Sequence, residues 1–196
     1  MRLSQRHIAI DLDDVMLDFM PSVMAAFERE YGVKVDYDGY PWGESANVFA
    51  KHSMFIQSGY KSWWDWLKDR DWLWSTFGVV PGSIGGVKRL REDGWYVECV
   101  TSKPEWAEYN VWKWLGKWRP AFNRVTVINT GHSKLDFTDA EVIVDDKLET
   151  CAIFAVNGRV GIQFDRRPHV PTGFRETNLY VASNWEDVVY FARSMK

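Results

Sequence analysis

Cysteine and histidine are scarce in this 196-residue chain, which argues against a disulfide framework and a zinc site. Cys99 and Cys151 are its only cysteines, and each lies inside an apolar segment (VECVTS and TCAIFAV). We therefore expect buried, reduced thiols in a reducing compartment. There is no Cys-x-x-Cys pair, and the four histidines are scattered along the chain: His7, His52, His132 and His169.

Long apolar runs and a surplus of basic residues are also missing. No run approaches the length of a membrane span, and only three apolar residues separate MRLSQRH from Asp11, too few for a signal peptide. We therefore expect a cytoplasmic protein with no membrane partner. The formal net charge of −3 argues against a stable nucleic-acid partner. A small phosphorylated ligand stays open, because it needs only one or two local cations.

Short β-rich runs alternate with helical patterns in a chain that is 46% apolar and 26% charged, as expected for a globular domain. The runs predict strands at 7–11, 96–101, 124–129, 141–146 and 159–164, and helices at 82–94, 104–118 and 147–158. Strands that alternate with helices indicate an α/β fold. We predict a Rossmann-like parallel sheet with helices on both faces.

The first interval between strands is too long for an ordinary crossover. Roughly ninety residues separate the acidic run after the first strand from Tyr96, with helical patterns at 17–31 and 60–74. We predict an α/β core made of residues 1–18 and 80–196 and a small helical cap inserted at 19–79. Such a cap would lie above the carboxyl end of the first strand, where open α/β sheets bind ligands.

Polar side chains follow three of the predicted strands, and a lysine precedes the fourth. They are Asp11, Asp13 and Asp14 after the first strand, Thr101, Ser102 and Lys103 after the second, Lys134 in a connection, and Asp145 and Asp146 after the fourth. Parallel strands end at one edge of a sheet, so these groups should meet in one crevice. Carboxylate oxygens from two strands suit Mg²⁺.

Each of these pieces also has a structural explanation. The acidic run could be a turn without a role, although it is not an EF-hand loop, because Met16 and Ser22 stand where Gly and Glu are required. Asp145 and Asp146 could cap the next helix, as could Thr101 and Ser102, and Lys134 could be a solvated lysine. Their common order at strand ends favours a site.

This order resembles the haloacid dehalogenase-like phosphatase superfamily, whose pattern is Asp-x-Asp-x-Val/Thr, a strand-end Thr or Ser, a later Lys, and Asp-Asp. Within that superfamily, DLDDVMLDF, VVPGSIGGVKRL, CVTSKP, IVDDK and SNWEDVV are similar to segments of the 5'(3')-deoxyribonucleotidases. Two residues depart from that family. Asp14 replaces its usual Gly, and Lys103 is an extra residue before Pro104.

The resemblance implies a mechanism. Asp11 would be the nucleophile that forms an aspartyl-phosphate, and Asp13 would protonate the leaving oxygen and then activate water. Thr101, Ser102 and Lys134 would bind the phosphoryl group. The expected cofactor is Mg²⁺, and its predicted ligands are Asp11, the backbone carbonyl of Asp13, Asp146 and, in support, Asp145.

The resemblance also implies that the cap selects the substrate, a deoxyribonucleoside monophosphate such as dUMP or dTMP. An apolar wall would favour deoxyribose, because a buried 2'-hydroxyl would lack a partner. Tryptophans at helical spacing are more often core than pocket. The predicted pocket residues are Phe19, Tyr40, Trp42, Trp66, Trp74 and Lys103.

Three alternatives stay open from the sequence. The same chemistry could act on a sugar phosphate or a polynucleotide 3'-phosphate. The chain could be an inactive relative that binds a nucleotide. A receiver domain also combines these residue types, but its Lys follows the last acidic motif, whereas Lys134 precedes Asp145. The resemblance also allows a homodimer, since those enzymes are often dimers.

Overall fold

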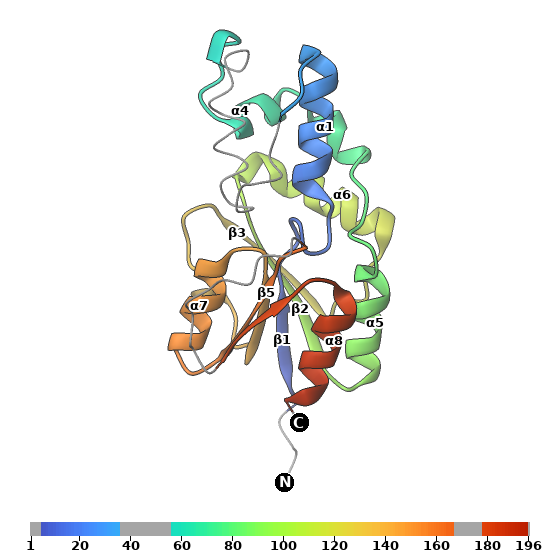
Figure 1. Ribbon diagram of the computed structural model, residues 1–196, viewed down its shortest axis with the longest axis vertical. Coiled ribbons are helices and arrows are strands. Elements are labelled where there is room, and N and C mark those ends of the chain that lie inside the picture. The colour runs from blue at the N-terminus through green and yellow to red at the C-terminus, as the bar shows by residue number, and fades with distance from the viewer. Residues whose placement is uncertain (1–4, 36–55, 167–177, 196) are drawn as a thin grey trace.

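The protein is a parallel sheet covered by helices on both faces, with further helices beyond one edge of the sheet (Figure 1). This computed structural model describes residues 5–35, 56–166 and 178–195. The strands are β1 (His7–Ile10), β2 (Tyr96–Lys103), β3 (Arg124–Asn129), β4 (Val142–Asp145), β5 (Val160–Phe164) and β6 (Leu179–Ala182), in the order β3-β2-β1-β4-β5-β6. The predicted fold class is confirmed.

The order of the strands reverses next to β1. From β1 the chain adds β2 and β3 on one side, then returns to add β4, β5 and β6 on the other. Ile10 pairs with Cys99 in β2 and with Val144 in β4, so β1 lies between the two halves. In open α/β sheets, ligands bind at such a reversal, outside the carboxyl ends of the strands.

Side chains alternate along the central strands and build two apolar layers. Ile8 and Ile10 belong to the larger layer, whereas Ala9 and Ile143 belong to a smaller one. Helices α5 (Ser83–Glu92) and α8 (Trp185–Ser194) pack against each other on one face, and α7 (Leu148–Val156) with the 3-10 turn η3 (Lys134–Phe137) covers the other. The helix α6 (Glu108–Trp118) follows the 3-10 turn η2 (Glu105–Ala107).

The described part of the predicted cap contains α1 (Phe19–Tyr31), α4 (Trp63–Lys68) and the 3-10 turn η1 (Asp71–Ser75). Figure 1 shows α1 and α4 beyond the end of β1. The chain leaves the core at Leu17 and returns at Val79, and these two residues form an antiparallel bridge. The stem of the insertion is thereby fixed beside the end of β1.

Two features of the carboxyl-terminal part were not predicted from strand or helix patterns. Strand β6 has only four residues, mostly half-buried, and gives too short a pattern to recognise. Helix α8 matches the Asn-Trp segment, in which Asn184 caps the helix by accepting the N–H of Asp187. Trp185 donates its indole N–H to the carbonyl oxygen of Val15, at 2.9 Å, and so supports the turn after β1.

The two cysteines are buried and free, as predicted. Burial raises the pKa of the Cys99 and Cys151 thiols, which keeps both protonated and unreactive. Among the described residues, no helix has the length and apolar character needed to cross a bilayer.

Candidate active site

A cavity of about 350 Å³ opens at the carboxyl edge of the sheet. One side is polar and the other is aromatic. Its lining consists of Asp11, Asp13, Asp14, Phe19, Met20, Trp63, Trp64, Ser102, Thr130, Gly131, Lys134, Asp146 and Lys147. The cavity therefore brings together residues from the first strand end, the cap, the second strand and the Asp-Asp motif, which lie far apart in the sequence.

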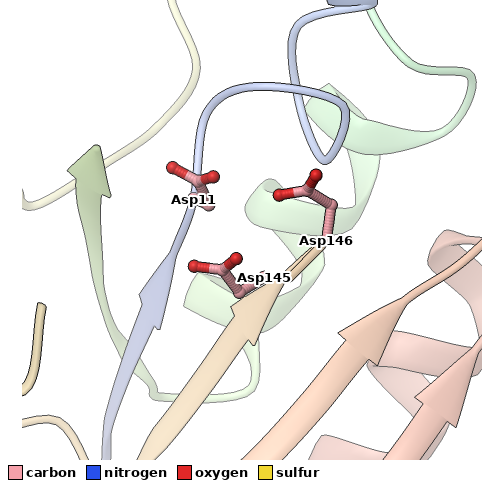
Figure 2. Close-up of side chains that lie close together, drawn as sticks. All are labelled: Asp11, Asp145 and Asp146. Carbon is pink, nitrogen blue, oxygen red and sulfur yellow. The ribbon is translucent and has the colours of Figure 1, made fainter. Parts of the chain in front are cut away.

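Three carboxylates form the centre of the polar side (Figure 2). Asp11 directly follows β1, Asp145 ends β4 and Asp146 comes next, and one carboxylate oxygen from each lies within 4.8 Å of the others. Asp11 is 4% exposed and Asp145 is fully buried. Three like charges at this separation repel each other strongly in a buried place, so the cluster requires cations.

Lys134 supplies one of these cations from the face covered by α7. Its Nζ lies 2.7 Å from Oδ1 of Asp11 and 2.6 Å from Oδ2 of Asp145. Burial alone would raise the pKa of Asp11, but the positive charges of Lys134 and Lys103 outweigh it and lower that pKa. Asp11 is thus held as an ionised carboxylate, the form that a nucleophile needs.

Asp146 is the member of the cluster that forms no ion pair with the residues that the structure describes. Its Oδ1 is buried and accepts no hydrogen bond from the described residues. Burial and the neighbouring carboxylates of Asp145 and Asp11 raise the pKa of Asp146 well above its ordinary value. These carboxylate oxygens fit a hard divalent cation such as Mg²⁺, which would remove both the repulsion and the missing contact.

A second buried lysine serves the neighbouring acid. Lys103 Nζ lies 2.7 Å from Oδ2 of Asp13 and donates to the hydroxyl of Thr101, at 2.8 Å. Ser102 lines the cavity, whereas Thr101 is fully buried just behind it. Lys103 does not belong to the cavity lining and is 1% exposed, so the structure differs from its predicted place in the substrate pocket.

Asp14, the departure from the usual Gly, has a left-handed backbone with φ of +56°. Asp is one of the residues that tolerate this conformation. Its Oδ1 accepts the backbone N–H of Met20 at 3.0 Å, in the first turn of α1, and lies 3.8 Å from the guanidinium of Arg166. Burial and the charge of Asp13 raise the pKa of Asp14 well above its ordinary value.

The aromatic side of the cavity is formed by Phe19, Trp63 and Trp64. The two tryptophan rings stack with centroids 3.9 Å apart, and Phe19 lies 5.4 Å from Trp63 and 5.7 Å from Trp64. Trp63 and Trp64 are half-buried and belong to the first turn of α4, which Ser62 caps by accepting the N–H of Asp65. Together they present a largely apolar wall.

The other predicted pocket residues lie elsewhere. Trp66 and Trp74 are 0% and 2% exposed, and neither lines the cavity. Trp66 packs against Phe27 and beneath the guanidinium of Arg70, because the buried face of α4 turns it into the apolar core. Trp74 supports the back of Phe19, 5.6 Å away. Tyr40 and Trp42 lie outside the described residues.

Several lining residues were not predicted. Lys147 directly follows Asp146, and that position beside the acidic pair could have indicated it. Thr130 and Gly131 follow β3, whose carboxyl end meets the same edge, so strand order could have indicated them too. Trp63 and Trp64 had no such signal, because helical spacing alone does not tell which tryptophans of a rich run face a ligand.

No family model and no curated protein sequence matches this chain. The structure, however, is similar to solved ones. A protein from Thermotoga maritima assigned as a β-phosphoglucomutase superposes with a TM-score of 0.65, at 13% identity over 97% of this chain and 100% of that one. The HAD-hydrolase YfnB from Bacillus subtilis, bound to magnesium, superposes with a TM-score of 0.60 at 14% identity. The match covers 95% of this chain and 98% of that one.

A HAD phosphatase from Thermococcus onnurineus and the L-2-haloacid dehalogenase RSc1362 also match, with TM-scores of 0.57 and 0.64 at 17% and 16% identity. The phosphatase match covers 95% of this chain and 97% of that one, and the dehalogenase match 97% and 100%. The chain therefore has the fold of the haloacid dehalogenase-like hydrolases, as its strand-end motifs predicted. Because these proteins carry out different reactions, the fold alone does not choose among them.

Proposed function

We propose that the protein is a Mg²⁺-dependent phosphomonoesterase that hydrolyses deoxyribonucleoside monophosphates, with pyrimidine nucleotides such as dUMP and dTMP as its substrates. The observation that carries this proposal is that one cavity joins the carboxylate cluster and Lys134 to the aromatic wall. The polar side suits a phosphoryl group, and the wall suits a flat base. Pockets of this size commonly hold small ligands.

In the first step, a carboxylate oxygen of Asp11 attacks phosphorus, and the bond between phosphorus and the sugar oxygen breaks. Asp13 gives its proton to that leaving oxygen. Lys134, which pairs with Asp11, offsets the negative charge of the phosphoryl oxygens, and Ser102 binds them from the cavity lining. An aspartyl-phosphate on Asp11 results.

In the second step, Asp13 takes a proton from water, and the water oxygen attacks phosphorus. The bond to the Asp11 oxygen breaks, which releases phosphate and restores both carboxyl groups. Mg²⁺, held by Asp11, Asp145, Asp146 and the backbone carbonyl of Asp13, would offset the repulsion between phosphate and carboxylates. The magnesium-bound state of YfnB supports this choice of cation.

Dehalogenation is another reaction found on this fold, and the features of the site favour phosphoryl transfer over it. A halide leaves as a stable anion and needs no proton, whereas this site holds a second carboxyl group, Asp13, beside Asp11. Burial raises the pKa of Asp13, which favours the protonated form that an acid catalyst needs. The unpartnered oxygen of Asp146 also has no use in a reaction that requires no cation.

The experiment is phosphate release from a panel of substrates, with Mg²⁺ and with EDTA. The panel contains deoxy- and ribonucleoside monophosphates, sugar phosphates, p-nitrophenyl phosphate and a 3'-phosphorylated oligonucleotide. Turnover that needs Mg²⁺ and is concentrated on pyrimidine deoxynucleotides is the expected result. Release from sugar phosphates alone would support the proposed phosphomonoesterase reaction but contradict recognition of a base by the aromatic wall. No release from any of these substrates would contradict the whole proposal.

A further inference from the structure

Lys103 is buried beside the cavity in a place where its amine reaches only protein atoms. It is 1% exposed, and its Nζ contacts Oδ2 of Asp13 at 2.7 Å, the hydroxyl of Thr101 at 2.8 Å and the carbonyl oxygen of Ser102 at 3.4 Å. A lysine ammonium has three N–H donors. All three are therefore directed at the framework of the site, which leaves none for a ligand.

Strand β2 fixes this geometry. Thr101 and Lys103 are two residues apart on the strand, so their side chains share one face of the sheet. The backbone of Lys103 is held by the neighbouring strand, because it pairs with Asn129 in β3 and its carbonyl accepts the N–H of Thr130. The ammonium is thereby carried by a rigid strand.

The pairing treats the two oxygens of Asp13 differently. Oδ2 is bound to Lys103, whereas Oδ1 is buried and has no hydrogen-bond partner among the described residues. Asp13 lines the cavity beside Asp11. The ion pair thus fixes the orientation of a carboxyl group whose side chain keeps 19% of its surface exposed.

We propose that Lys103 is a positioning residue for Asp13, holding the acid in place to protonate the leaving oxygen. This inference rests on the proposed function. It differs from a substrate contact, because Lys103 acts through Asp13 and not on the ligand. It also differs from the role of Lys134, whose amine pairs with Asp11 and Asp145 and lies in the cavity lining.

The dependence on the leaving group separates this role from others. A sugar alkoxide is a poor leaving group and needs the proton from Asp13, whereas p-nitrophenolate is stable as an anion and leaves without it. A misplaced acid therefore slows formation of the aspartyl-phosphate from the first kind of substrate and largely spares it with the second. Hydrolysis of the aspartyl-phosphate, in which Asp13 acts as the base, slows equally for both, so the comparison is made on release of the leaving group in a single turnover. Loss of a substrate contact would instead raise KM, and a general structural defect would slow both substrates equally.

The variant is Lys103→Met, which keeps the length of the aliphatic part of the side chain and removes the amine. We expect the single-turnover rate of leaving-group release to fall about 100-fold on the preferred alkyl phosphomonoester, the usual size of a general-acid effect, and less than about fivefold on p-nitrophenyl phosphate, with KM little changed. Lys103→Arg should recover part of the loss. The matched control is Lys88→Met, since Lys88 is an exposed lysine on α5 that pairs with Glu92 at 3.7 Å; both rates should stay at the wild-type level.

Equal losses of the single-turnover rate on the two substrates, or an effect confined to KM, would overturn the proposal. A crystal structure of Lys103→Met tests it independently of turnover, because the Asp13 carboxylate should leave its wild-type orientation. An unchanged Asp13 would contradict positioning even if the wild-type protein released no phosphate. Inactive wild-type protein would contradict the proposed function, so the two failures are distinguishable.

Discussion

The two sides of the cavity are built by different means. On the sheet side, charged groups at strand ends are fixed by short contacts, such as those of Lys134 with Asp11 and of Lys103 with Asp13, both at 2.7 Å. On the cap side, Phe19, Trp63 and Trp64 meet through ring contacts between 3.9 and 5.7 Å. One side consists of directional ionic contacts and the other of broad apolar surfaces.

The difference suggests a division of work. Rigid strands hold reacting groups to within the small tolerance that bond making requires. A wall of aromatic rings recognises shape and apolar area and tolerates small displacements. Changes on the sheet side should therefore alter the rate for every substrate, whereas changes on the cap side should alter affinity and depend on the substrate.

The largest expected effect comes from the sheet side. Asp11→Asn should lower kcat by about 10⁴-fold or more on every substrate, because the amide cannot act as the nucleophile. The folded state should persist, since Asn has the same shape and Lys134 keeps its contact with Asp145 at 2.6 Å. Phosphate release measures the loss of activity, and circular dichroism measures whether the fold persists. Near-wild-type turnover in the variant would disprove the mechanism.

The second prediction concerns the stability of the metal-free protein, in which no divalent cation offsets the charges of the three carboxylates. The pKa of Asp146 is raised above its ordinary value of 3.8 by burial and by two neighbouring carboxylates. The folded state therefore binds more protons than the unfolded state, and the metal-free protein loses stability as the pH rises from near 3.8 through the raised pKa. Mg²⁺ should reverse the loss, by about 2.7 kcal/mol at a hundred times its Kd.

Urea unfolding at pH 5.5 and pH 7.5, with EDTA and with Mg²⁺, measures this effect. Asp146→Asn is the matched variant, because it removes the titrating group and keeps its shape. We expect it to raise the stability of the metal-free protein at pH 7.5 and to weaken the stabilisation by Mg²⁺. If Mg²⁺ stabilised the variant as much as the wild type, Asp146 would not be a ligand of the metal.

The sheet side could be predicted from the sequence far better than the cap side. Asp11, Asp145 and Asp146 follow β-rich runs, and parallel strands must end at one edge, so their meeting follows from topology. The choice of Trp63 and Trp64 over Trp66 depends on how α4 is set against the core, and three tryptophans within four positions give no pattern that decides it.

The pairing of Lys103 with Asp13 lies between these two cases. The sequence places both residues at the carboxyl edge of the sheet, but whether the lysine faces a ligand or a carboxylate depends on β2 continuing to Lys103. The predicted strand ended at Thr101. Two further residues in the strand put Lys103 on the same face as Thr101, pointing at protein atoms.

The third prediction tests the cap side. Trp64→Ala should raise KM for nucleoside monophosphates about tenfold, the size expected for loss of a base-stacking contact, and leave KM for p-nitrophenyl phosphate less changed. The value of kcat should hold, because no contact at the carboxylates is altered. Trp72→Ala is the control, since Trp72 is 57% exposed and does not line the cavity. Equal changes in KM for both substrates would show that Trp64 does not select the substrate.

The smallest effect is expected at Asp14, where the two sides meet. Asp14 lines the cavity and also accepts the N–H of Met20 in the first turn of α1. Asp14→Asn keeps the acceptor oxygen and the tolerance for a left-handed backbone, and it removes a buried charge, so stability at pH 7.5 should stay the same or rise.

Asp14→Ala removes the acceptor and also a residue type that tolerates the left-handed backbone. It should cost about 1 kcal/mol for the lost cap and about 1 kcal/mol more for backbone strain. Urea unfolding of the two variants separates the charge, which both remove, from the acceptor oxygen and the backbone preference, which only Ala removes. If the Ala variant is as stable as the Asn variant, the contact with Met20 contributes nothing to the cap helix. Asp14 would then belong to the sheet side alone, and the boundary between the two sides would lie at Phe19.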